Sequence, residues 1–148
     1  MEKAITMFKR INKSPIFWSV LVILVATIFF RNNSGEEVIY QIDNEIIGIG
    51  SGEDTVFIGL LNIVSVDLTD SVDISDPVSE VIAGAVRNGD YRSDGLGEFS
   101  LIAYDSTPQY IVIRHTGGTT VFNCKNTVST EKAYNELISA VAAAKAQT

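Results

Sequence analysis

Residues 109–125, QYIVIRHTGGTTVFNCK, decide the fold of the chain's body. Two runs rich in β-branched and aromatic residues flank a Gly-Gly pair, and such a pair between apolar runs is a strong signal for a β-hairpin. Side chains alternate between the two faces of a strand, so a turn centred on the glycines gives the hairpin one strongly apolar face. We predict that this face enters the core with Ile111, Ile113, Phe122 and Cys124.

The segment after the hairpin predicts the only long helix of the body. Ser129 or Thr130 can cap its first turn, and no Gly or Pro interrupts the chain as far as about Ala146. Four apolar residues recur there with the i, i+3, i+4, i+7 spacing of a buried stripe. The predicted stripe is Tyr134, Leu137, Ile138 and Val141, and the opposite, exposed face is Asn135, Glu136, Ser139, Ala142 and Ala143.

Further strands are predicted before the hairpin. Residues 38–43 and 45–50 form a hairpin around Asp43-Asn44, and residues 55–68 form two strands bent near residues 60–62. Residues 97–105 supply another strand. Between them, Asp76 can cap a short helix over residues 77–86 that begins with a proline.

These elements predict one α+β domain, mainly β, over residues 38–148, with about seven antiparallel strands and a C-terminal helix. The chain has a single cysteine, so no disulfide within the chain can support it.

Residues 16–30, IFWSVLVILVATIFF, carry no charge and no glycine. A membrane-spanning helix needs about 20 apolar residues and tolerates about 17, and the flanking Lys13 and Arg31 can extend a shorter run by snorkelling. The flanks favour an uncleaved anchor over residues 16–31. A cleaved signal peptide and a buried helix of a soluble protein remain as alternatives, although the first lacks good small residues at a cleavage site and the second lacks a polar face.

The anchor divides the chain into a basic amphipathic head (residues 1–15), the transmembrane signal-anchor (16–31), a linker (32–37) and the folded body (38–148). The head is either a short helix on the membrane surface or an unstructured charged segment. Four basic residues precede the anchor and one follows it, which predicts a cytoplasmic N-terminus and a body outside the cytoplasm.

The charge of the body restricts its partners. Residues 32–148 hold six basic and seventeen acidic residues, a net charge of −11. Such a body repels anionic lipid and nucleic acid, so we expect neither nucleic acid nor a phosphoinositide as a ligand. The bilayer, through residues 16–31, and a protein partner or a second copy remain.

Several short patterns resemble those of small bacterial domains of the pleckstrin-homology (PH) superfold. The resemblance covers about residues 36–142, and its motifs are I-V-S-V-D-L at residues 63–68, R-x-x-G-x-G-x-F-x-L at 92–101, Y-I-V-I at 110–113, V-F-N at 121–123 and E-K-A-Y-N-E-L at 131–137. It implies a bent, open antiparallel barrel with the C-terminal helix closing one end. Such domains often lie beside membrane helices, and the matched residues are packing and turn residues, so the resemblance implies no site residue.

Four groups of residues suggest a site, and each has a simpler explanation. Asp67, Asp70, Asp73 and Asp76 recur at every third residue, but calcium loops space their ligands differently, and a solvated loop accounts for them. Residues 48–54, GIGSGED, lack the ending of a phosphate-binding loop and lead into a strand.

His115 and Cys124 are the only residues that can form a Cys–His dyad, and the predicted hairpin separates them by about 13 Å. We expect Cys124 in the core and His115 beside the turn. Arg87, Arg92 and Arg114 can form an anion pocket, but Asp90 and Asp94 are close enough in sequence to pair with two of them. The sequence thus predicts no catalytic, cofactor-binding or metal residue and no cofactor.

We therefore expect a non-catalytic interaction or assembly module at the membrane that binds through an exposed strand edge or self-associates. A small-ligand or calcium sensor, or a cleaved secreted protein of the same fold, is the alternative.

The predicted orientation in the membrane can be tested with reporter fusions. A reporter that is active only after export, fused after Thr148, should be active, whereas a reporter that works only in the cytoplasm should be silent. The reverse result would contradict the orientation, and the mass of the mature N-terminus distinguishes an anchor from a cleaved signal.

Overall fold

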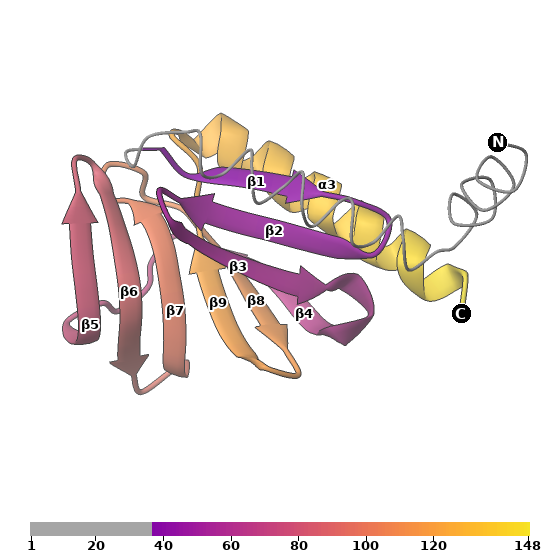
Figure 1. Cartoon of the computed structure of the whole chain (residues 1–148), viewed down its shortest axis with the longest axis horizontal. Helices are drawn as coiled ribbons and strands as arrows, with labels where there is room; N and C mark the ends of the chain where they lie inside the picture. Colours follow the sequence, from indigo (N-terminus) through magenta and orange to yellow (C-terminus); the bar gives the residue numbers. More distant parts are fainter. Residues whose placement is uncertain (1–36) are drawn as a thin grey trace, which may run out of the picture.

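A computed structural model describes residues 37–148, and these residues are mainly β with one helix at the C-terminal end (Figure 1). A three-stranded antiparallel sheet has the order β1-β2-β3 and comprises β1 (Ile39–Ile42), β2 (Ile46–Ser51) and β3 (Asp54–Gly59). The predicted head and anchor lie outside the described residues, as does all but the last residue of the linker.

The second sheet has six strands in the order β4-β8-β9-β7-β6-β5. The strands are β4 (Ile63–Thr69), β5 (Asp76–Ala83), β6 (Val86–Ser93), β7 (Gly97–Tyr104), β8 (Tyr110–His115) and β9 (Gly118–Phe122). The 3₁₀ turn η1 (Leu60–Asn62) joins β3 to β4, which confirms the predicted bend between two strands.

The main core lies on one face of the six-stranded sheet. The three-stranded sheet crosses this face over β9, β8 and β4, and helix α3 (Thr127–Ala146) runs beside β1 (Figure 1). The predicted apolar face of the hairpin is confirmed, because its four residues are buried in this core. They are Ile111, Ile113, Phe122 and Cys124.

A second, smaller core lies on the opposite face of the same sheet. Because strand side chains alternate, Val112 and Val121 point away from the main core and join Tyr91, Phe99 and Leu101. The connection from β4 to β5 must pass between opposite ends of the sheet, and its Val72 and Ile74 pack on this cluster. The chain thereby covers both faces of its central strands.

The predicted mainly β fold with a C-terminal helix is confirmed, but the structure differs from the predicted barrel of about seven antiparallel strands in two respects. The described residues form nine strands in two sheets and no closed barrel. The pairing is also not wholly antiparallel, since β7 and β9 are parallel through Ser100–Thr120, Leu101–Val121 and Ile102–Phe122. Long-range pairing of this kind carries no local sequence signal.

The side chain of Asn123, the residue after β9, connects β9 to the end of β7 beyond the last backbone residue pair. Its side chain is fully buried, and its Oδ1 accepts a hydrogen bond from the Tyr104 backbone N at 2.7 Å. Its Nδ2 donates to the backbone oxygens of Tyr104 at 3.1 Å and Thr107 at 3.2 Å. The amide thus substitutes for a further backbone pair and fixes the loop before β8.

The predicted helix over residues 77–86 is also wrong, because β5 occupies most of it and β6 begins at Val86. Asp76 and Pro77 suit a helix start locally, but Val78, Val81 and Ile82 suit a strand. The overlooked signal is Gly84, whose φ of 61° lies in the turn between the paired residues Ala83 and Val86.

Two details of the C-terminal helix differ from prediction. Its N-cap is Asn126, whose side chain accepts from the Ser129 backbone N at 2.8 Å, so neither Ser129 nor Thr130 is the cap. The buried stripe is centred on Ala133 and Leu137, which are fully buried, whereas Ile138 is 38% exposed. The predicted exposed face of the helix is confirmed.

Because Leu137 is fully buried and the next residue, Ile138, is partly exposed, the same substitution should have different costs at the two positions. Leu137→Asp places an unpaired charge in the core and should lower the free energy of unfolding by about 4 kcal/mol or more. Ile138→Asp, one residue further, should cost only about 1 kcal/mol. Asn135→Asp adds the same charge on the exposed face and serves as the control. Denaturant titration measures all three, and equal losses for Leu137→Asp and Ile138→Asp would contradict the packing.

Gly89 on β6 gives a second prediction, because β5 approaches it closely. A Cβ at Gly89 would lie 1.9 Å from the backbone oxygen of Ser79, so Gly89→Ala must displace β5. We expect a loss of about 1–3 kcal/mol in the free energy of unfolding. Gly95→Ala is the control, since its Cβ would meet nothing within 4 Å. A neutral Gly89→Ala would show that β5 is not held against β6.

Candidate functional site

Strand β5 ends the six-stranded sheet, and no strand of residues 37–148 pairs with its outer edge. Figure 1 shows β5 and β6 extending beyond the three-stranded sheet, on the side away from α3. Seven of the eight residues of β5 are exposed, and three of them are large aliphatic residues: Val78 (59% exposed), Val81 (61%) and Ile82 (56%). An unpaired apolar edge of this kind is a template for another strand.

Only the first part of this edge is protected. Pro77 lacks a backbone N–H, and the register shifts between Pro77 and Ser79 as in a β-bulge. From Ser79 to Ala83 the pairing with β6 is regular, so the outward backbone groups of this part form a continuous row. An extended segment has room to add there.

A side-chain network holds β5 to β6 and keeps this edge in place. Arg87 donates to Glu80 at 2.7 Å and, through Nε and a terminal nitrogen, to both carboxylate oxygens of Asp105 at 2.9 and 3.1 Å. The Tyr91 hydroxyl also donates to Glu80.

These bonds shift the ionisation of Glu80. The hydrogen bond from Tyr91, followed by the one from Arg87, holds the pKa of Glu80 below its ordinary value. A carboxyl with a lowered folded-state pKa contributes stability above its unfolded pKa, and this contribution is lost as the pH falls through the folded pKa. The network therefore holds β5 at neutral pH.

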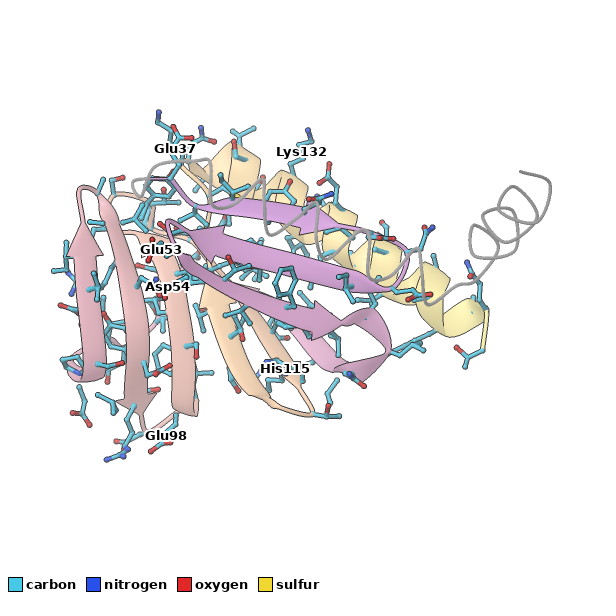
Figure 2. All side chains as sticks on the ribbon, viewed as in Figure 1. Glu37, Glu53, Asp54, Glu98, His115 and Lys132 are labelled. Carbon is cyan, nitrogen blue, oxygen red and sulfur yellow. The ribbon has the colours of Figure 1, made fainter. Side chains whose placement is uncertain are left out.

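A groove of about 410 Å³ runs beside β5 on the face that the three-stranded sheet partly covers. Figure 2 shows Asp54 at the start of β3, where the two sheets meet. Apolar side chains of three strands and two aspartates line the groove, among them Val56, Val81, Ile102, Asp54 and Asp90.

In the part of the chain that the structure describes, the two aspartates of the groove accept side-chain hydrogen bonds from neutral groups alone. Asp54 accepts from the Asn88 amide at 2.7 Å, and Asp90 accepts from the hydroxyls of Ser79 at 3.3 Å and Ser100 at 2.7 Å. Within residues 37–148, no Lys or Arg forms an ion pair with either carboxylate. The groove therefore keeps a negative charge that a bound segment can neutralise.

A second pocket, of about 490 Å³, lies on the other face, between the β4–β5 connection and the turn before β7. At the wall of this pocket, Arg114 forms an ion pair of 2.7 Å with Asp67, and Asp73 and Asp94 also line the pocket. Val72 and Leu96 supply apolar lining. Its charges of both signs suit a small polar ligand.

The series of aspartates predicted as a solvated loop is divided by the fold. Asp67 lies on β4, Asp70 and Asp73 lie in the connection, and Asp76 begins β5. Asp73 accepts from the backbone N and the hydroxyl of Ser75, which lower its pKa. Nowhere in residues 37–148 do three or more His, Cys, Asp or Glu side chains gather in a way that suits a metal ion.

The structure keeps His115 and Cys124 apart. His115 ends β8 opposite Gly118, and its ring nitrogens contact the Thr120 hydroxyl at 3.1 Å and the Gly117 backbone N at 3.2 Å. Figure 2 shows His115 at the hairpin end, away from the groove. Burial, with a smaller effect of Glu136, raises the pKa of the Cys124 thiol to about 11, which disfavours a thiolate.

The three arginines form ion pairs, but not with the carboxylates named from sequence proximity. Besides the pairs of Arg87 and Arg114, Arg92 pairs with Glu98 at 2.7 Å. Within residues 37–148 neither Asp90 nor Asp94 joins these pairs, because each arginine meets a carboxylate on or next to a strand that pairs with its own. The glycine-rich segment 48–54 forms the end of β2 and its turn into β3.

Among the helices of residues 37–148, none combines the length and the apolar character that a membrane span requires. Comparison with models of known protein families gives no match. Comparisons with curated proteins and with solved structures also give no match. The resemblance to PH-like domains therefore stays a prediction.

Proposed function

We propose that this protein is a membrane-anchored, non-catalytic module that binds a protein partner by accepting an extended segment at the free edge of β5. Residues 16–31 form the anchor, the N-terminus stays in the cytoplasm, and the body faces the other side of the membrane. The anchor and its orientation rest on the sequence arguments, and the binding edge rests on the fold.

The observation that carries the proposal is the exposed apolar edge of β5. Edge strands of soluble domains are usually short, charged or covered, because an open edge recruits other strands. This one has eight residues, exposes Val78, Val81 and Ile82, and holds its only charged residues at Asp76 and Glu80. Backbone hydrogen bonds at such an edge give affinity, and the alternate side chains give specificity.

The charge of the body favours a different protein over a second copy. A second copy would bring another body with a net charge of −11 against the first. An antiparallel pair of β5 strands centred on Glu80 would also place two glutamates opposite each other, which is unfavourable. A partner strand without acidic residues avoids both costs.

A small-ligand sensor is the second candidate, and the 490 Å³ pocket beside Arg114 and Asp94 favours it. A ligand of this pocket would pack between the β4–β5 connection and the turn that precedes β7. A rise in melting temperature on adding small polar metabolites, abolished by Arg114→Met, would favour the sensor over the strand-binding module.

Exposed aliphatic residues provide a matched test of the proposal. Val81→Lys places a charge on the free edge, whereas Val64→Lys and Val128→Lys make the same change at other exposed positions, 69% and 76% exposed. The full chain, cross-linked in its own membrane, should form a discrete complex that Val81→Lys abolishes and the two controls keep. All variants should keep the wild-type melting temperature within a few degrees.

Two results would contradict the proposal. One is a wild-type chain that forms no complex, and the other is a complex that Val81→Lys leaves intact or that the control variants also abolish.

A further inference from the structure

We infer that the segment bound at β5 is basic on one face: its residues over the groove carry lysine or arginine, and its alternate residues are apolar. This inference rests on the proposed function and adds the chemistry of the partner. It follows from the different charges on the two faces of the sheet next to β5.

A strand added to β5 continues the pleat of the sheet, so its side chains alternate between the same two faces. On the groove face they meet Ser79 and Val81. On the opposite face they meet Ile82 and Glu80, whose backbone borders the groove but whose carboxylate accepts hydrogen bonds from Arg87 and Tyr91. The register of β5 with β6 therefore fixes which positions of the incoming segment face which charges.

The two faces differ in how far their acidic groups are neutralised. On the opposite face, the guanidinium of Arg87 lies between Glu80 and Asp105. On the groove face, the described residues offer Asp54 and Asp90 no charged side-chain donor, only the neutral groups of Asn88, Ser79 and Ser100. A cationic side chain is thus favoured over the groove and not on the other face.

The position of Asp90 is suited to such a side chain. Ser79 pairs with Asp90, and Asp90 pairs with Ser100, so the three residues form one row across the sheet. A residue that pairs with the free side of Ser79 continues this row, two strand spacings or about 10 Å from Asp90. A long lysine or arginine can lay its apolar stem along Val81 and direct its charge towards the carboxylate.

Defined peptides test this inference with the full chain in uncharged detergent micelles. Three labelled octapeptides alternate valine with lysine, with threonine or with glutamate, and fluorescence anisotropy measures their dissociation constants. The Lys-Val peptide should bind about three- to tenfold more tightly than the Thr-Val peptide, and the Glu-Val peptide more weakly than both. The preference should fall as salt rises.

Charge-neutralising variants locate the effect. Asp54→Asn and Asp90→Asn together should remove the preference for the Lys-Val peptide, whereas the control Asp70→Asn, a change at an exposed aspartate outside the groove, should retain it. Equal loss of the preference in Asp70→Asn would overturn the inference, because the attraction would then be a property of the whole acidic body.

The remaining outcomes separate the inference from the proposed function. If the Lys-Val and Thr-Val peptides bind equally well, the basic face is wrong and strand addition stands. If none of the three peptides binds, strand addition at β5 and the basic face both fail.

Discussion

The parallel pairing of β9 with β7 is the constraint on which the rest of the structure depends. Three residue pairs and the buried amide of Asn123 join the β4-β8-β9 half of the large sheet to its β7-β6-β5 half. Because β9 is inserted at this place, β4 and β5, which follow each other in the chain, end at opposite edges of the sheet. If β4 and β5 formed a hairpin, they would lie side by side, and they could not be the two opposite edges of the sheet.

The exposed edge follows from this arrangement. The connection from β4 to β5 has to cross the sheet, and its Val72 and Ile74 cover the second core on the way. The three-stranded sheet and α3 cover the other face near β4, β8 and β9, and β5 lies beyond them (Figure 1). Val78, Val81 and Ile82 of β5 therefore remain more than half exposed, and the network around Arg87 holds the strand against β6.

Local patterns in the sequence predicted the parts of the fold that depend on local periodicity. The hairpin face with Ile111 and Phe122 follows from alternation, and the burial of Leu137 follows from helical spacing. The parallel β7–β9 pairing joins segments with no common signal, so the prediction of a wholly antiparallel barrel was wrong. Asp76-Pro77 satisfies the local rules for a helix start, whereas the β-branched residues after it and the turn at Gly84 favour the strand that pairs with β6. The groove could not be predicted from the sequence, because Asp54 and Asp90 line it together only once the two sheets pack against each other.

The proposed binding surface combines an acidic body, the open edge of β5 and the groove that holds Asp54 and Asp90. Hydrogen–deuterium exchange of the full chain, with and without the Lys-Val peptide, tests the location of this binding surface most directly. Binding should slow exchange at backbone amides within Ser79–Ala83, the part of β5 open to a further strand, and should leave the amides of β1 unchanged. Slower exchange in β1 or α3, with β5 unaffected, would contradict it.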